Sequence, residues 1–322
     1  MKTGRLGPLE GVSRLVLGGG GLGGVWGATS AAEAGEVLTA AIDGGITLLD
    51  MAPGYRDAQT IIGAHFGGRL PDGVKVTTKE WIGTRPERDY AQRLRASLEA
   101  SLKTMRLEAV DVFFLHNEIR PDAITYPPGD EPQEAVSTPL SHYLEDVVPA
   151  MEALVRDGLA RSWGITATGH PEGIAAAMDH AQKPAVAQIV SNLLDSPGNL
   201  SKHGQPYDPR AQAAAAQARG IGVMGIRVVQ AGALTAGFDR EVPASNPNRH
   251  DFDRAAPFRA LAAEWGADPA DIALRYALGM DNIDCIVLGV KSLAELRAAL
   301  RAEADGPLKP GEMARIDGLY GR

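Results

Sequence analysis

Residues 30–50 read SAAEAGEVLTAAIDGGITLLD, a helix pattern followed at once by a short apolar strand pattern. Apolar residues recur at spacings of three and four, Ser30 can cap the helix and Gly44 can end it. The run ITLLD (46–50) then predicts a buried strand that ends in a carboxylate. A helix followed at once by a strand is the repeating unit of an alternating α/β fold. The number of such units along the chain therefore decides which α/β fold the sequence predicts.

The unit recurs along the whole chain of 322 residues. Short apolar runs alternate with helix-like segments. The apolar runs are RLVLG (14–18), ITLLD (46–50), VKVTTK (74–79), VDVFFLH (110–116), ARSWGIT (160–166), AVAQIVSN (185–192), GIGVMGI (220–226) and IDCIVLG (283–289). This alternation indicates a parallel sheet, either open and doubly wound or closed as a barrel. Eight units without a change of composition between them favour the closed form. The sequence therefore predicts an α/β fold, a single (β/α)8 TIM barrel domain over residues 1–322.

Three further segments are expected around this barrel. Turn residues in RLGPLEGVSRLV (5–16) predict a small β-hairpin before the first barrel strand. Two stretches, 117–142 and 230–256, are rich in proline and acidic residues and show no helical period. Long loops inside a compact domain are usually functional lids or disordered segments. Because both stretches follow predicted strand ends, we expect them at the mouth formed by the carboxyl ends of the barrel strands.

The composition limits the partners of the chain. Lysine and arginine total 32 against 40 aspartate and glutamate residues, which gives a formal net charge of −8. Nucleic acids and anionic membranes attract basic surfaces, so neither is an expected partner. No apolar run is long enough to cross a bilayer, and the opening residues do not form a secretory signal. We expect a cytoplasmic protein, and the composition leaves its oligomeric state open.

The cysteine and histidine content points to no metal or disulfide chemistry. The single cysteine, Cys285, lies inside an apolar run and is expected to be a small buried hydrophobic residue. The histidines outside the strand ends show no metal-ligand spacing. No metal site is therefore expected.

The glycine-rich run RLVLGGGGLGGVWG (14–27) contains the G-x-G-x-x-G pattern of a Rossmann dinucleotide-binding turn. Asp50 could then serve as the acid that binds the cofactor ribose. This alternative, a Rossmann-type dehydrogenase, requires a cofactor domain of about 150 residues followed by a separate substrate domain. The strand–helix pattern runs on without such a boundary, which disfavours the alternative.

Polar side chains stand at the ends of three consecutive predicted strands. Asp50 ends the second apolar run, Lys79 the third and His116 the fourth, and Tyr55 follows Asp50 by five residues. The carboxyl ends of barrel strands share one mouth, so these four side chains are expected to converge there. Each residue alone has an ordinary structural explanation, such as a capping aspartate or a core histidine. Four of them at neighbouring strand ends point to a site.

These four residue types together form a general acid–base device. A tyrosine of ordinary pKa, about 10, exchanges its proton poorly at neutral pH. A lysine ammonium beside it is expected to stabilise the phenolate and lower that pKa. The aspartate would fix and balance the lysine, and the histidine would hydrogen-bond a carbonyl oxygen of the substrate. Such a set can add a proton to an oxygen, or remove one, without a metal.

With these motifs in this order, the sequence resembles the aldo-keto reductase family. GITLLDMAPGYRDAQTIIG (45–63) is similar to the family segment that carries the aspartate and tyrosine, and VKVTTK and DVFFLH resemble its lysine and histidine strands. The likeness continues through AQIVSN, AGALTAG, ADIALRYAL and CIVLGVKSLAELRAAL. It implies an NAD(P)H-dependent oxidoreductase that reduces an aldehyde or ketone, or oxidises an alcohol or sugar in reverse. By this resemblance Tyr55 is the proton donor, Lys79 tunes it, Asp50 pairs with Lys79 and His116 orients the carbonyl.

The resemblance also implies a cofactor site and a substrate pocket. The implied cofactor positions are Gly20, Gly21, Asp50, Thr166, Gln188, Ile226, Gly232, Leu234, Gly289, Lys291, Ser292 and Glu295, and the implied substrate positions are Trp26, Trp81 and Asn117. The first two glycines would approach the nicotinamide. Thr166 and Gln188 would bind its carboxamide, and Ile226 takes the place of an aromatic residue that often stacks on it. The backbones of Gly232 and Leu234 would follow the diphosphate.

Several positions depart from the family pattern and bear on the choice of cofactor. Thr166 is followed by Ala167, where serine and asparagine are frequent, so only Thr166 can bond the carboxamide. Gly289 and Lys291 would open a helix beside the adenosine phosphate, where N-terminal amides favour an anion. Glu295 would disfavour a 2′-phosphate, whereas Lys291 would favour it. On the habit of the family we expect NADP in preference to NAD, acting on a small carbonyl or sugar substrate.

A regulatory role is the alternative from another class. Some members of the family act as redox-sensing regulatory subunits that bind cofactor with little turnover. Such a role needs a partner surface, and no large basic or apolar stripe is visible in the sequence. Tight cofactor binding without turnover would favour this alternative.

Overall fold

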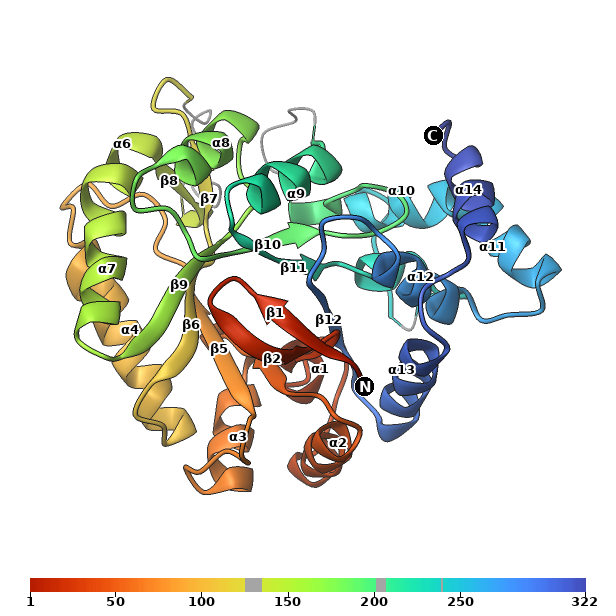
Figure 1. Cartoon of the computed structure of the whole chain (residues 1–322), viewed down its shortest axis with the longest axis horizontal. Coiled ribbons are helices and arrows are strands. Elements are labelled where there is room, and N and C mark those ends of the chain that lie inside the picture. Colours follow the sequence, from red (N-terminus) through yellow and green to blue (C-terminus); the bar gives the residue numbers. More distant parts are fainter. Residues whose placement is uncertain (125–134, 201–206, 239) are drawn as a thin grey trace.

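Eight parallel strands close into one barrel in the computed structural model, which describes residues 1–124, 135–200, 207–238 and 240–322 (Figure 1). The barrel strands are β3 (Leu15–Gly18), β4 (Leu48–Asp50), β5 (Lys75–Glu80), β6 (Val110–Leu115), β9 (Ala160–Thr166), β10 (Val186–Val190), β11 (Gly222–Ile226) and β12 (Cys285–Gly289). Each pairs with the next barrel strand along the chain, and β12 pairs with β3 to close the ring. Every predicted apolar run is a barrel strand, so the single (β/α)8 barrel is confirmed and the two-domain Rossmann alternative is wrong.

Helices surround the strands as an outer layer (Figure 1). They are α2 (Ala31–Asp43), α3 (Ala58–Phe66), α4 (Tyr90–Met105), α7 (Val148–Arg156), α8 (Pro171–Asp179), α9 (Pro209–Ala218), α11 (Ala256–Glu264), α12 (Pro269–Leu278), α13 (Leu293–Asp305) and α14 (Pro310–Gly318). Helix α2 begins with a capping box, because Ser30 Oγ accepts the Glu33 N–H at 3.2 Å and the Glu33 carboxylate accepts the Ser30 N–H at 2.9 Å. Such caps fix the start of each helix and hence the end of the loop before it.

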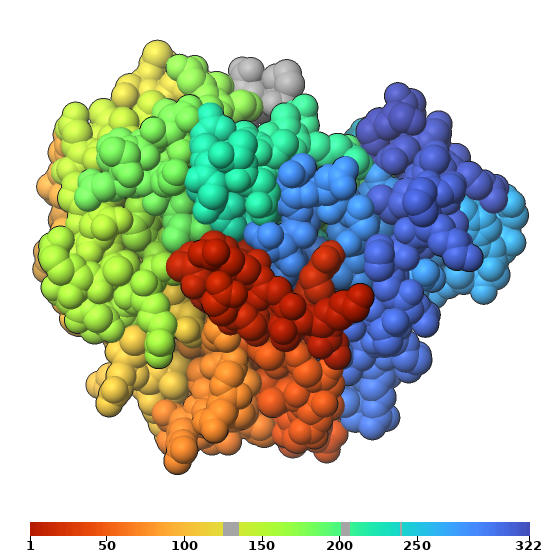
Figure 2. Space-filling model, viewed as in Figure 1, coloured from red at the N-terminus to blue at the C-terminus, as the bar shows by residue number. Residues whose placement is uncertain are grey.

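The predicted hairpin, β1 (Thr3–Leu6) and β2 (Leu9–Ser13), covers the amino-terminal end of the barrel. Figure 2 shows it in red across the middle of the visible face. Its turn residue Gly7 has a φ of +54°, and a Cβ there would lie 2.4 Å from the Ala185 carbonyl oxygen before β10. Apolar side chains of the hairpin pack with those inside the barrel, Cys285 among them. The hairpin therefore closes one end and leaves the other for the chemistry.

The two predicted long loops contain regular structure, so their description as aperiodic is corrected. The first carries β7 (Glu118–Arg120), β8 (Ser137–Pro139) and α6 (Leu140–His142), with residues 125–134 outside the described part. The second carries a 3-10 turn (Gln230–Gly232) and α10 (Pro247–Arg254). Strands of three residues are too short to show an alternation, and α10 has polar residues on all sides. The start of α10 nevertheless has a signal in the sequence, because the capping residue Asn246 is followed directly by a proline.

Candidate active site

Four side chains predicted to converge lie together at the carboxyl end of the barrel. Asp50 ends β4, Lys79 lies in β5, His116 follows β6, and Tyr55 ends a 3-10 turn, Pro53–Tyr55. Lys79 Nζ lies 2.5 Å from Asp50 Oδ1, with the two side chains 0% and 2% exposed. The same Nζ lies 5.3 Å from the centroid of the Tyr55 ring, and the Tyr55 and His116 ring centroids are 6.4 Å apart at 87°. The tyrosine therefore lies close to both the buried ion pair and the histidine.

Asp50 is the centre of a buried hydrogen-bond network. Besides Lys79, its Oδ1 accepts from Thr77 Oγ1 at 2.7 Å and from Gln188 Nε2 at 2.9 Å. Gln188 Oε1 in turn accepts from Thr166 Oγ1 at 3.2 Å. Thr77 was missed from the sequence, although its position two residues before Lys79 on one strand puts both on the same face. The network joins the acid–base group to two residues of the implied cofactor site.

Burial controls the proton affinity of Tyr55. Removal from water raises the pKa of the Tyr55 phenol well above 10, and the charge of Asp50 raises it further. Burial lowers the pKa of Lys79, while its interaction with Asp50 acts in the opposite direction. The phenol is therefore protonated at neutral pH.

His116 is covered by the indole of Trp81, one of the three implied substrate positions. The two rings are stacked, with centroids 4.7 Å apart and planes at 15°, and half of Trp81 remains exposed. Burial lowers the pKa of His116 well below 6.5, and the charge of Lys79 lowers it further. The imidazole is therefore neutral at neutral pH and can form a hydrogen bond to a carbonyl oxygen without carrying a charge.

Asn117 is a structural residue in its observed contacts, although the resemblance placed it in the substrate pocket. It is 1% exposed. Its Oδ1 accepts the Ile82 N–H at 2.8 Å, and its Nδ2 donates to Thr138 Oγ1 at 2.7 Å. Both ends of the amide thus fasten the segment after β5 to β8, which leaves little of it for a substrate.

Trp26 lies beside implied cofactor positions and not beside His116. A Cβ built on Gly20 would lie 2.8 Å from the Trp26 indole nitrogen, and one on Gly289 would lie 3.3 Å from it. The Arg240 guanidinium is 5.3 Å from the Trp26 ring centroid. The glycines therefore make room for this indole, which lies beside the ends of β3 and β12.

Three other implied cofactor positions are occupied by contacts within the chain. Gly21 lies in the short helix α1 (Gly19–Leu22), where a Cβ would be 1.9 Å from the Val290 carbonyl oxygen. The N–H groups of Gly232 and Leu234 both donate to the Val229 carbonyl, at 3.0 and 3.2 Å. Close packing against Val290 accounts for a glycine at position 21. The N–H groups of Gly232 and Leu234, which were expected to follow a diphosphate, are bonded within their own turn. Ile226 ends β11 and is partly exposed.

The start of α13 holds the residues implied for the adenosine end. Ser292 caps the helix by accepting the Glu295 N–H at 3.2 Å. The Glu295 carboxylate accepts the Lys291 N–H at 2.9 Å and lies 4.0 Å from Lys291 Nζ. An acidic side chain therefore already occupies the donors that an incoming phosphate would use.

The buried polar pair Thr166 and Gln188 fits the amide end of a nicotinamide cofactor, with the two residues 4% and 2% exposed at paired positions of the neighbouring strands β9 and β10. Among the residues that the structure describes, no group of three or more His, Cys, Asp or Glu side chains could hold a metal ion. Within the same residues no helix is long and apolar enough to span a membrane.

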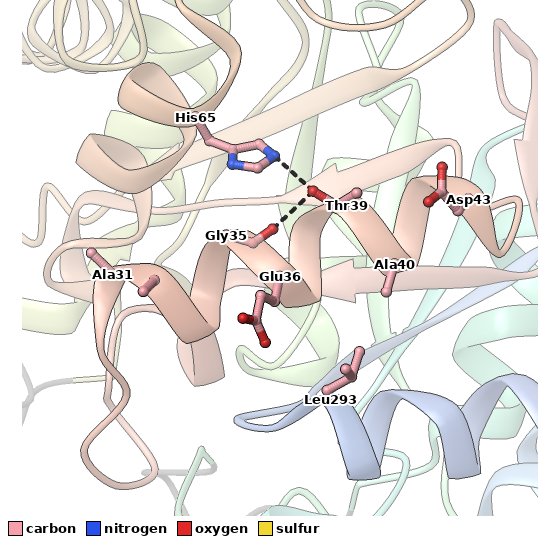
Figure 3. A pocket seen from close by; sticks show the side chains of 9 residues that line it. Ala31, Gly35, Glu36, Thr39, Ala40, Asp43, His65 and Leu293 are labelled. Carbon is pink, nitrogen blue, oxygen red and sulfur yellow. Dashed lines mark hydrogen bonds between the residues drawn. The ribbon is translucent and has the colours of Figure 1, made fainter.

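A separate hollow of about 530 Å³ lies on the outside of the barrel between α2, α3 and α13. Figure 3 shows that its lining combines small residues of α2 with the carboxylates Glu36 and Asp43, with Thr39 bonded to His65 and Leu293 opposite. It shares no residue with the group around Asp50. The group around Asp50, at the mouth of the barrel, is therefore the candidate active site.

Comparison with known proteins agrees with this geometry. A model described as the Aldo/keto reductase family matches residues 14–321. The chain is 27% identical to human aldo-keto reductase family 1 member C2 over 88% of this chain and 82% of that protein, and 26% identical to bovine dihydrodiol dehydrogenase 3 over 89% and 83%. The solved structure of aldo-keto reductase AKR11C1 from Bacillus halodurans (holo form) is similar with a TM-score of 0.71, at 21% identity over 99% of this chain and 96% of that one.

Proposed function

Because the chain belongs to the aldo/keto reductase family, and is thus an NAD(P)-dependent oxidoreductase, we propose that it reduces an aldehyde or ketone with Tyr55 as proton donor. The observation that carries this proposal is the position of Tyr55 close to both the buried Lys79–Asp50 pair and His116. A phenol with a raised pKa keeps its proton until a substrate oxygen gains charge.

The proposed reaction divides its work among six side chains. Bound reduced nicotinamide would supply a hydride to the carbonyl carbon. The Tyr55 hydroxyl gives its proton to the carbonyl oxygen, which becomes the alcohol, and the phenolate left behind is stabilised by the Lys79 ammonium. Neutral His116 donates a hydrogen bond that orients the carbonyl oxygen, and Trp81 keeps water from the imidazole. Thr166 and Gln188 would hold the carboxamide of the cofactor.

An activity screen tests this proposal directly. The purified protein is mixed with NADPH or NADH and with aldehydes, ketones and sugars, and loss of absorbance of the reduced nicotinamide is followed. Dihydrodiols with the oxidised cofactors are included because a relative is named for them. We expect carbonyl-dependent oxidation of the cofactor at neutral pH. Tight cofactor binding with no turnover across the panel would instead support the regulatory alternative.

For the cofactor we propose NADP, with Lys291 as the cation that meets the 2′-phosphate and Glu295 as the group that opposes it. The substitution Glu295→Gln keeps an acceptor for the Lys291 N–H but removes the charge near Lys291 Nζ. We expect the affinity for NADPH to rise by about fivefold, since an exposed ion pair of this kind contributes roughly 1 kcal/mol. The affinity for NADH should change little. Titration of protein fluorescence with each cofactor measures both.

The matched control is Glu33→Gln, which alters the same capping arrangement at the start of α2. It should cost helix stability without changing the ratio of the two affinities. An unchanged ratio in Glu295→Gln would show that Glu295 only caps α13.

A further inference from the structure

We propose that Gln188 is a positioning residue, which acts on Tyr55 through Asp50 by holding that carboxylate in place and partly balancing its charge. The inference rests on the proposed function in assigning Tyr55 the proton transfer, and it adds a role for Gln188 beyond contact with a cofactor. The geometry that points to it is the 2.9 Å hydrogen bond from Gln188 Nε2 to Asp50 Oδ1.

The bond joins two sides of the barrel. Gln188 lies in β10 and Asp50 ends β4, so the contact crosses the interior between strands that are not neighbours in the ring. Both side chains are 2% exposed, so neither has much access to water as an alternative partner. The far end of the amide is held by Thr166 Oγ1 at 3.2 Å, and Met224 Sδ lies 3.2 Å from Nε2. The amide is thus oriented with its donor toward Asp50.

The consequence is electrostatic. The single oxygen Asp50 Oδ1 accepts hydrogen bonds from Lys79, Thr77 and Gln188. Each donor places positive charge beside that oxygen and weakens the negative potential which it projects toward Tyr55. Without the Gln188 donor, Asp50 would act more strongly on both neighbours: it would hold the Lys79 ammonium more tightly and would disfavour the Tyr55 phenolate more.

The titratable groups that face this centre come from four strands. They are Asp50 from β4, Lys79 from β5, His116 after β6, and Cys285 from β12, whose thiol senses the charge of Asp50. Burial keeps His116 neutral and raises the pKa of Cys285, so neither adds a charge near neutral pH. Changes of the Tyr55 proton affinity on substitution of Gln188 therefore report on Asp50 and Lys79.

The experiment compares Gln188→Met and Gln188→Glu with the wild type. The first keeps the length of the side chain and removes the donor, and the second keeps its shape and adds a carboxylate. In the cofactor complex, the pH profile of alcohol oxidation should shift upward by about half a unit in Gln188→Met and by at least about one unit in Gln188→Glu. Protein carrying 3-fluorotyrosine, whose phenol ionises at lower pH, gives the same midpoint by ¹⁹F NMR without turnover, with the Tyr55 signal assigned from Tyr55→Phe.

Gln59→Met is the matched control, because Gln59 is an equally buried amide that donates to Thr78 and Ser101 and not to Asp50. It should lower stability and leave the midpoint of Tyr55 in place. A midpoint unchanged in Gln188→Met, or moved equally by Gln59→Met, overturns the inference, even where cofactor affinity falls. Absence of turnover in the wild type would refute the proposed function separately, and the NMR midpoint would still decide the role of Gln188.

Discussion

Tyr55→Phe will lower kcat for carbonyl reduction by about a thousandfold or more and leave the affinity for the reduced cofactor close to that of the wild type. Phenylalanine preserves the ring that lies 5.3 Å from Lys79 Nζ and meets His116 edge to face, so packing is retained. What is lost is the hydroxyl proton, and a positioned acid contributes about 10²–10⁴-fold to such a step. Single-turnover kinetics with premixed cofactor measure the loss, and fluorescence titration measures the affinity.

Tyr90→Phe is the control for this prediction. Tyr90 is a buried tyrosine whose hydroxyl accepts the Arg85 N–H at 2.9 Å, away from the ion pair. Removal of the Tyr90 hydroxyl should lower the stability of the protein and leave kcat unchanged. Substantial turnover in Tyr55→Phe would remove Tyr55 from the role of proton donor, and the acid would then have to be sought elsewhere at the mouth.

The barrel was predictable because its strands carry a strong local signal. Parallel strands covered by helices are buried on both sides and read as apolar runs, as Leu15–Gly18 and Cys285–Gly289 do. The weaker elements carry no such signal. Helix α10 is polar on all sides and is held by tertiary bonds, such as Gln230 Nε2 to Asp251 Oδ2 at 2.6 Å. No pattern of its own apolar residues could have shown it.

The positions of the four central residues followed from strand ends, but their energetics did not. The sequence predicts that Lys79 lowers the pKa of Tyr55, but it does not show that burial and the charge of Asp50 raise that pKa. The roles of Asn117 and Gln188 depend on partners 21 and 138 residues away in the chain, Thr138 and Asp50. Such contacts are fixed by closure of the barrel and leave no local trace in the sequence.

The buried ion pair makes Lys79→Met the second substitution with a large expected effect, on stability as well as on rate. Removing Lys79 leaves the Asp50 carboxylate as an uncompensated charge in a site 2% exposed. Breaking one partner of a buried pair costs about 3–5 kcal/mol of the free energy of unfolding. Turnover should also fall by about a thousandfold, because the phenolate of Tyr55 loses its cation.

The double variant Asp50→Asn/Lys79→Met separates the two effects. Asparagine keeps an acceptor oxygen for Thr77 and Gln188 while both charges are gone, so most of the lost stability should return. Turnover should stay as low as in Lys79→Met, since neutrality does not restore the cation beside Tyr55. Urea unfolding and steady-state reduction rates measure the two quantities on the same preparations. A double variant that regains turnover would show that Lys79 only neutralises Asp50. A double variant as unstable as Lys79→Met would show that the lost stability comes from packing and not from the uncompensated charge.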